Sequence, residues 1–225
     1  MLRLDHAGYA VRDLDEAAMR FREVYGLDSV VGGRHVGFGT ANRIVPLGPN
    51  YLELIGVVDR LEAEASAFGR SVLERTAEGD GWLLMVVSSD DVAAEAGRLG
   101  LEVQEGLRAR LDGSEIRWRM AGIDDPRREP WMPFFITWDI SDELYPGRQR
   151  ASHGVRPEAI AWVEIGGDAE RLRAWLGDED LPIRVSGGEP GIHRVAIATS
   201  DGEFAIEQEG PGSRGSRPRP SVSSV

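Results

Sequence analysis

Polar and apolar residues alternate along the first segment of the chain, residues 2–11. Leu2, Leu4, His6 and Gly8 fall on one face, as they would in a β-strand. Residues 13–25 place apolar side chains at helical intervals instead, behind a capping-box spacing of acidic residues, and a glycine follows at the point where a helix would end. Three β-rich segments come next, at 29–35, 40–47 and 51–57, separated by glycine-containing turns. Residues 1–58 therefore predict a βαβββ module.

The same order of elements recurs twice along the chain. After a linking helix expected at 59–76, within a linker of residues 59–81, residues 82–140 predict a second βαβββ module and residues 159–209 a third, partial one. The second module is predicted as strand 82–87, helix 89–99 and strands 101–106, 115–121 and 133–140, and the third as strand 159–165, helix 168–176 and strands 182–185, 192–199 and 204–208. Residues 210–225 are rich in Pro, Ser and Gly and contain no acidic residue, which predicts a disordered tail. We expect residues 1–209 to form a single α+β domain.

Composition removes several classes of function. The 225 residues contain no Cys, which excludes a thiol nucleophile, a disulfide and an iron-sulfur cluster. The 26 basic residues are all Arg, which excludes a Schiff-base lysine and a Walker phosphate loop. A net charge of -12 argues against nucleic acid as a partner. The chain starts without an apolar signal segment, and its longest apolar run is too short to span a bilayer, so we expect a cytoplasmic protein without a membrane partner.

His6 and Glu53 are the first candidates for chemistry. His6 lies on the first predicted strand, and Glu53 shares a face of the fourth with Tyr51 and Ile55. A carboxylate between apolar neighbours on a buried face requires a partner. One interpretation pairs it with an arginine such as Arg43; the other gives it a functional role.

Several motifs in order resemble a known superfamily. The repeated βαβββ unit, His6 within LDH, and Glu53 within YLEL resemble the vicinal oxygen chelate superfamily. The stretch from GGRH at 32–35 through GTANR at 39–43 to YLEL at 51–54 is similar, more narrowly, to its glyoxalase-like domain family. The resemblance covers residues 2–165. It implies that the paired modules curl into an open, cup-shaped β-barrel, with the third partial α/β unit beside it.

The resemblance also implies a divalent metal, Zn, Fe, Mn, Ni or Mg, that chelates two adjacent substrate oxygens. His6 and Glu53 fall on the first module's two ligand positions, and Glu53 is also the candidate catalytic base. Superposing the predicted helix starts aligns His6 with Trp82, and the last strand of the second module has no acid or His before Asp139. The second module's ligands are therefore missing. His35 is the candidate third ligand, with a turn histidine that binds loop carbonyls as the alternative.

Six further residues are candidates for substrate binding. Aromatic side chains of the second module would give the cup an apolar wall, and polar side chains after a Gly-rich turn would orient a ligand oxygen. Core packing and exposed-strand positions are the respective alternatives. The candidates are Asn42, Arg43, Trp82, Phe134, Trp138 and His153. His153 precedes the third unit and is also a supplementary candidate for a metal ligand, with a structural or exposed position as its alternative, and we interpret His193 as structural.

Three functions remain open at this point. The first, which we expect because His6 and Glu53 fill both ligand positions of the first module, is a metal-dependent lyase, isomerase or dioxygenase acting on a small molecule with vicinal oxygens. The second is a metal-free protein that binds or sequesters a small ligand in the same cup, which the missing ligands favour. The third is a structural or interaction role. The resemblance also implies a homodimer. A GxGxxG string at 210–215 does not indicate dinucleotide binding, because a Pro-rich segment follows it where a helix should start.

Overall fold

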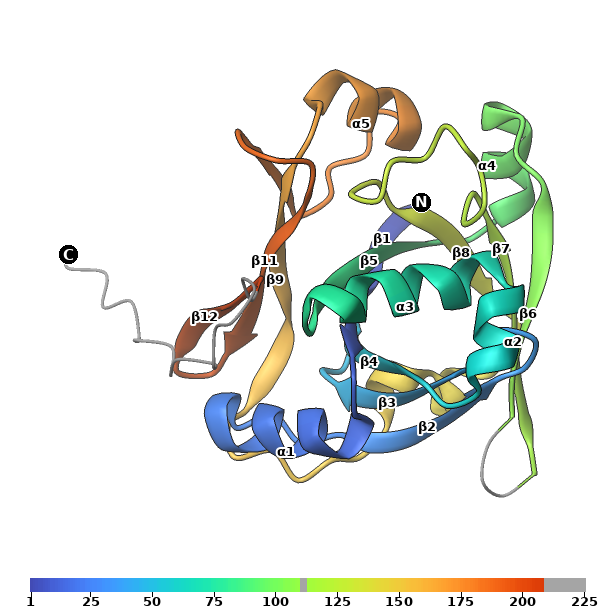
Figure 1. The fold of residues 1–225 in the computed structure, drawn as a ribbon. Helices are drawn as coiled ribbons and strands as arrows, with labels where there is room; N and C mark the ends of the chain where they lie inside the picture. Colours follow the sequence, from blue (N-terminus) through green and yellow to red (C-terminus); the bar gives the residue numbers. More distant parts are fainter. Residues whose placement is uncertain (110–112, 209–225) are drawn as a thin grey trace, which may run out of the picture.

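The computed structural model describes residues 1–109 and 113–208, so the predicted tail and its GxGxxG string lie outside the described residues. Two βαβββ modules are followed by a second sheet, as Figure 1 shows. The first module comprises β1 (Leu2–Val11), α1 (Leu14–Tyr25), β2 (Val30–His35), β3 (Thr40–Pro46) and β4 (Tyr51–Val57). After α2 (Arg60–Ala65) and α3 (Ala67–Glu78), the second comprises β5 (Gly81–Ser89), α4 (Val92–Leu99), β6 (Val103–Ala109), β7 (Glu115–Ala121) and β8 (Phe134–Trp138). Two short 3-10 helices, η1 (Asp142–Leu144) and η2 (Pro146–Arg148), precede β9 (Pro157–Gly166), α5 (Ala169–Leu176), β10 (Ile183–Ser186), β11 (Gly191–Thr199) and β12 (Gly202–Glu207).

The eight strands of the two modules form one barrel, in the order β1-β4-β3-β2-β6-β7-β8-β5. Within each module the first and last strands pair in parallel, and the modules join through the antiparallel pair β1–β5. A short pairing of β2 with β6, Arg34 with Ala109 and His35 with Arg108, closes the ring. The predicted α+β fold with a cup-shaped barrel of paired modules is confirmed.

The segment predicted as one linking helix is two helices. The backbone is extended at Ser66, with φ -105° and ψ 147°, and the Ser66 hydroxyl accepts a hydrogen bond from the Gly69 amide at the start of α3. Ser66 therefore ends α2 and caps α3, a role that apolar periodicity alone does not reveal. Figure 1 shows α3 across one end of the barrel, where Phe68 and Val72 pack against the apolar residues of the interior.

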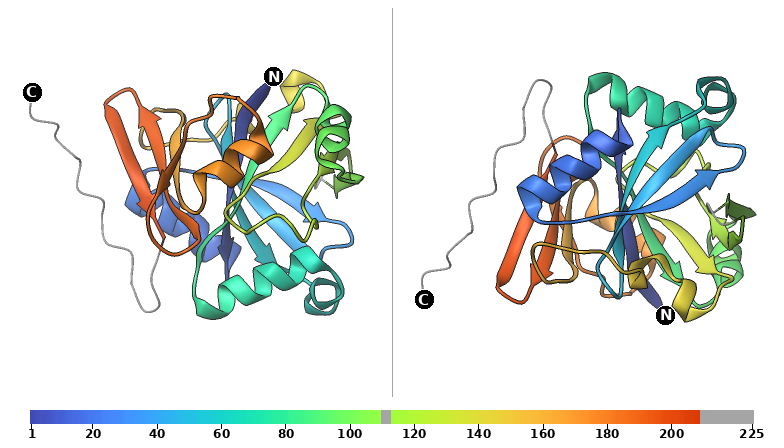
Figure 2. Two further views of the ribbon diagram at one scale, coloured as in Figure 1. Left: turned by 90° about the horizontal axis from the view of Figure 1, so that it is seen from above. Right: turned by 90° about the horizontal axis from the view of Figure 1, so that it is seen from below.

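The second sheet, in the order β10-β9-β11-β12, packs against the outer face of the barrel. Figures 1 and 2 show this sheet beside β1 and β5, with α1 and α5 at its two ends. One apolar cluster includes Met85 of β5 together with Val163 of β9 and Val195 of β11. Such shared packing is what a single domain requires, and the single-domain organisation over residues 1–209 stays our proposal.

A β-bulge at Asp5 changes which faces the residues of β1 share. Leu4 pairs with Val87 and His6 with Val86, so Asp5 is the extra residue on β1. Leu4 consequently packs in the outer cluster, whereas His6 lines the barrel cavity. The expectation that Leu4 and His6 share a face is wrong, because a bulge shifts the alternation by one residue.

In residues 1–109 and 113–208, no helix is both long and apolar enough to cross a membrane.

Candidate functional site

Three predicted site residues from three strands meet inside the barrel. His6 of β1 lies with its Nε2 3.5 Å from Glu53 Oε2 on β4, and His35 at the end of β2 has its Nε2 3.3 Å from Glu53 Oε1. All three side chains are buried, and the His6 ring stacks on Tyr51 at a centroid distance of 4.4 Å. The structure thus brings His6, His35 and Glu53 together. It does not pair Glu53 with Arg43.

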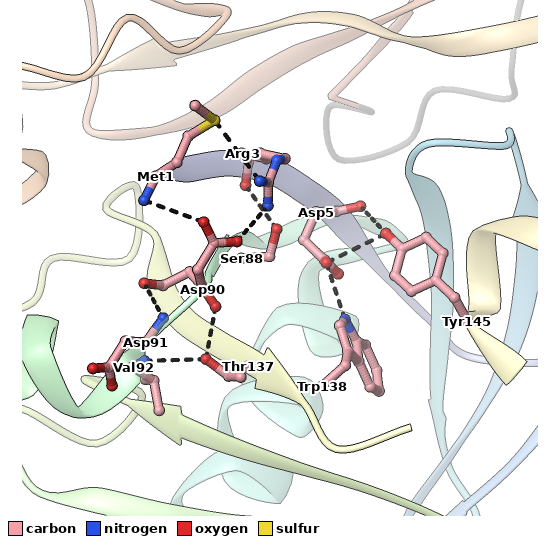
Figure 3. A network of polar contacts seen from close by, with 11 residues as sticks. Met1, Arg3, Asp5, Ser88, Asp90, Asp91, Val92, Thr137, Trp138 and Tyr145 are labelled. Carbon is pink, nitrogen blue, oxygen red and sulfur yellow. Dashed lines mark hydrogen bonds and ion pairs between the residues drawn. The ribbon is translucent and has the colours of Figure 1, made fainter. Parts of the chain in front are cut away.

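Asp5, the bulged residue, holds the far side of the His6 ring. Its Oδ1 lies 2.6 Å from His6 Nδ1, and its Oδ2 accepts hydrogen bonds from Trp138 Nε1 at 3.0 Å and the Tyr145 hydroxyl at 3.3 Å. Figure 3 shows the Trp138 and Tyr145 side chains converging on this carboxylate. A carboxylate on Nδ1 fixes a proton there, so His6 presents its Nε2 to Glu53.

The contacts set the charge states of the central pair. Burial lowers the pKa of His6, but the hydrogen bonds to Asp5 and Glu53 outweigh it and raise that pKa to about 9. Burial likewise raises the pKa of Glu53, but the hydrogen bonds from His35 and His6 outweigh it and hold that pKa well below its usual range. At neutral pH the pair is therefore an imidazolium beside a carboxylate. Burial raises the pKa of Tyr145, which keeps its phenol protonated as a donor.

Asn42 and Thr40 of β3 orient the other half of the cluster. The Asn42 side-chain amide donates to Glu53 Oε1 and also lies 3.2 Å from His35 Nε2. The Thr40 hydroxyl lies 2.9 Å from His35 Nδ1. Asn42, predicted to orient a ligand oxygen, thus contacts Glu53 directly and positions its carboxylate.

An apolar cavity of about 50 Å³ opens beside this cluster inside the barrel. Phe134 and Trp138 line it, as predicted for an aromatic wall. The complete lining is His6, His35, Phe38, Tyr51, Glu53, Phe68, Leu84, Arg108, Trp118, Met120, Ile123, Phe134, Ile136 and Trp138. The space is several times what one water needs, so the cavity has room for a small organic group among apolar and aromatic walls.

The pairing of the two modules identifies what replaces the missing ligands. On the antiparallel pair β1–β5, His6 is opposite Val86 and Gly8 is opposite Leu84. A two-fold rotation that exchanges β1 with β5 places the first of these pairs on the second, so His6 is equivalent to Leu84 and Gly8 to Val86. The helix caps agree, because His6 precedes the α1 cap Asp13 by the same spacing as Leu84 precedes the α4 cap Asp91. The alignment of His6 with Trp82 is wrong, because it places the start of that helix at Ser89.

The same exchange assigns a counterpart to Glu53. Gly8 pairs with Glu53 on β4, and Val86, the counterpart of Gly8, pairs with Phe134 on β8. Leu84 and Phe134 therefore stand at the second module's ligand positions, and both line the cavity.

Four predicted substrate-binding residues do not line the cavity, and Asn42, which contacts Glu53, is one of them. Arg43 bonds Ser29 and Asp15 on the outer side of β3. Trp82 packs between the barrel and the second sheet, where its Nε1 donates to the Ile206 carbonyl at 3.1 Å.

His153 joins two loops, and it also lies away from the cavity. Its Nδ1 accepts from the Asp28 amide at 3.1 Å, and its Nε2 lies 2.9 Å from the Pro46 carbonyl. Burial lowers the pKa of His153, which suits a neutral structural ring. His193 contacts the Glu189 carbonyl at 2.8 Å, in keeping with the structural role predicted for it.

The predicted metal ligands do not fit a metal ion as they lie. His6, His35 and Glu53 have the donor types of a two-histidine, one-carboxylate site. However, the Asn42 N–H group points at Glu53 Oε1 beside His35 Nε2, where a cation would be repelled, and the second module supplies only Leu84 and Phe134. Over the described part of the chain, no group of three or more His, Cys, Asp or Glu is arranged to hold an ion.

Sequence reasoning missed Asp5, Arg108 and Tyr145. Asp5 is adjacent to His6, but strict alternation assigns it to the opposite face. Arg108 lies beyond the strand predicted at 101–106, although β6 continues to Ala109. Tyr145 follows the last predicted strand of the second module in a segment without periodicity, so the sequence contains no signal that it reaches Asp5.

Comparisons with known proteins agree with the fold. A family model described as a glyoxalase-like domain matches residues 4–181. A hypothetical protein from Staphylococcus aureus has a similar structure, with TM-score 0.64 and 19% identity, covering 93% of this chain and 87% of that one. The methylmalonyl-CoA epimerase of Streptomyces coelicolor, solved as a variant in complex with 2-nitronate-propionyl-CoA, gives TM-score 0.46 and 22% identity over 61% of this chain and 98% of that one. A search of curated proteins finds no match in sequence.

Proposed function

Because the chain belongs to the glyoxalase-like domain family of the vicinal oxygen chelate superfamily, we propose that it is an isomerase-type enzyme that moves a proton on a small molecule with adjacent oxygens. The observation that carries this proposal is the state of Glu53. Glu53 is a buried carboxylate on the wall of the cavity, and its contacts with the rings of His6 and His35 keep it ionised. A desolvated carboxylate facing a cavity is suited to accept a proton from carbon.

The low pKa of Glu53 restricts the substrate. A carboxylate with a low pKa is a weak base, so it abstracts a proton only from a carbon whose anion is stabilised, such as one next to a carbonyl group. In the proposed step the C–H bond breaks, the proton goes to a Glu53 oxygen, and the electron pair moves onto the carbonyl oxygen as an enolate. Glu53 then returns the proton to the substrate carbon.

His6 and its neighbours stabilise the charge that develops. The His6 imidazolium lies on the cavity wall beside Glu53, where a positive group favours an enolate oxygen. Asp5 holds the ring in place through Nδ1. The aromatic side chains around the cavity exclude water, which strengthens these electrostatic interactions.

A metal-dependent enzyme of the lyase, isomerase or dioxygenase type is the second candidate function. The donor types of His6, His35 and Glu53 favour it, although their present arrangement does not fit an ion. Elemental analysis after incubation with Zn, Mn, Fe(II), Ni or Mg tests this candidate, with His6→Ala and Glu53→Ala as controls. Stoichiometric metal that both substitutions abolish would replace the metal-free mechanism proposed above.

Proton exchange with solvent is the direct test of the proposed function. Hydroxyacetone, acetoin and pyruvate are incubated with the protein in D2O, and loss of the ¹H signals next to the carbonyl is followed by NMR. We expect exchange with the wild type and at least about a hundredfold slower exchange with Glu53→Gln, the loss typical of a removed general base. His193→Gln, distant from the cavity, is the control. Exchange that Glu53→Gln leaves unchanged contradicts the proposal.

Binding without exchange would support the alternative of a metal-free ligand-binding or drug-sequestering protein. The homodimer and the cytoplasmic location remain predictions; light scattering and cell fractionation respectively test them.

A further inference from the structure

A buried arginine lies on the cavity wall, outside the cluster described so far. Arg108 of β6 is 2% exposed and lines the cavity with His35 and Glu53. Burying a guanidinium is costly, and arginine is the side chain best suited to bind a planar pair of oxygens through two parallel hydrogen bonds. A buried guanidinium on the wall of this cavity is therefore placed to bind an anionic group that enters it.

The neighbouring strand packs closely against this side chain. A Cβ atom at Gly32 would lie 2.0 Å from Asn42 Oδ1 and 3.2 Å from Arg108 Nη1, and one at Gly33 would lie 2.1 Å from the Ala109 carbonyl oxygen and 3.0 Å from Arg108 Cγ. A larger residue at either position would clash with Asn42 or with the backbone at Ala109, and it would also crowd Arg108. The two glycines thus allow β2 to lie close to Arg108 and Asn42.

The strand register places Arg108 next to His35, which contacts the proposed base. Arg108 pairs with His35 across the β2–β6 closure, and directly paired residues point to the same side of a sheet. His35 contacts Glu53. Asn42, which like Arg108 lies against Gly32, donates a hydrogen bond to Glu53. Arg108 and Glu53 both line the cavity, so a molecule bound there can contact both side chains.

We propose that Arg108 binds the carboxylate of the substrate, and that the substrates are small 2-oxo acids. This inference rests on the proposed function, which it narrows from any molecule with adjacent oxygens to an anionic one. A 2-oxo acid has a carboxylate for Arg108, an adjacent carbonyl oxygen for His6, and an acidic C–H group for Glu53. Charge-assisted bonds in a desolvated site are stronger than bonds between neutral groups, so the carboxylate determines affinity.

The test compares two probes that differ in charge. Binding of pyruvate and of its neutral amide, pyruvamide, to the full-length protein is measured by isothermal titration calorimetry. The wild type should bind pyruvate at least about tenfold more tightly than pyruvamide. Arg108→Met should lose this preference, and Arg108→Lys should retain part of it, because lysine keeps the charge without the two-pronged geometry. Arg117→Met is the matched control, because Arg117 is exposed on β7 and pairs with Glu115.

Four outcomes separate the two proposals. Pyruvate preference that Arg108→Met abolishes, in a variant that retains the wild-type circular dichroism spectrum and unfolding midpoint, supports the inference. Equal binding of both probes by the wild type, or binding of neither, overturns it. A preference that Arg108→Met leaves intact overturns it also. In each case the proposed function is tested separately, because proton exchange on hydroxyacetone, a neutral probe, depends on Glu53 and not on Arg108.

Discussion

Replacing His6 should make the stability of the protein depend less on pH. In the folded protein the pKa of His6 is raised to about 9, against 6.5 for the unfolded chain. Between these values the folded state holds a proton that the unfolded state has released. The stabilisation is fully present below pH 6.5 and is lost as pH rises through 9. The two pKa values correspond to about 3 kcal/mol of unfolding free energy.

Urea unfolding of the wild type and of His6→Gln, at intervals from pH 6 to pH 10, measures this contribution. Glutamine cannot titrate but retains hydrogen-bonding atoms for Asp5 and Glu53. The difference in unfolding free energy between the two proteins should be largest at pH 6 and should shrink by about 3 kcal/mol by pH 10. His193→Gln, which removes a histidine near the surface, is the control substitution. A difference that is constant across the range, or that grows with pH, refutes the imidazolium assigned to His6.

Three other variants test separate parts of the structure. Trp82→Phe removes the indole N–H that bonds β12 and should lower the unfolding free energy by about 2 kcal/mol while ligand binding is retained; loss of binding would place Trp82 in the site after all. Asp5→Asn should lower the pKa of His6, measured by NMR titration, because it removes a hydrogen-bonded negative charge; an unchanged pKa contradicts the contact. Leu84→His combined with Phe134→Glu should add metal binding, seen by elemental analysis, because it places donors at the second module's ligand positions. Failure to bind zinc would contradict the equivalence assigned to these positions.

Much of the fold follows from local signals in the sequence. Asp13 and Gly26 mark the two ends of α1, and alternation marks the strands, because capping and side-chain alternation are properties of a few neighbouring residues. The repeat of these signals predicts the second module. The sequence did not predict the break between α2 and α3 at Ser66 or the β-bulge at Asp5, because each depends on backbone geometry that tertiary packing selects.

The candidate site was predictable in part, for a related reason. His6, His35 and Glu53 stand out because polar residues are unusual on buried strand faces. Arg108 does not stand out among the 26 basic residues, since nothing in its sequence neighbourhood marks it as buried. Trp82 was predicted to line the cup because it is an aromatic residue on a strand of the second module, and its actual position between the barrel and the second sheet depends on packing that the sequence does not show. A two-residue error in the N-cap of α4 shifted the alignment of the modules. Barrel closure, which pairs His35 with Arg108, depends on residues far apart in the sequence.

The central claim is that at neutral pH His6 is a protonated imidazolium whose Nε2 faces the ionised Glu53 carboxylate. The protonation of the His6 ring nitrogens can be observed directly by ¹⁵N NMR of histidine-labelled protein, with His6→Gln to assign the signals. Both ring nitrogens of His6 should be protonated at pH 7, and one equivalent of Zn²⁺ should leave them so. An unprotonated Nε2 at pH 7, or a proton that Zn²⁺ displaces, would contradict the claim and favour the metal-dependent enzyme.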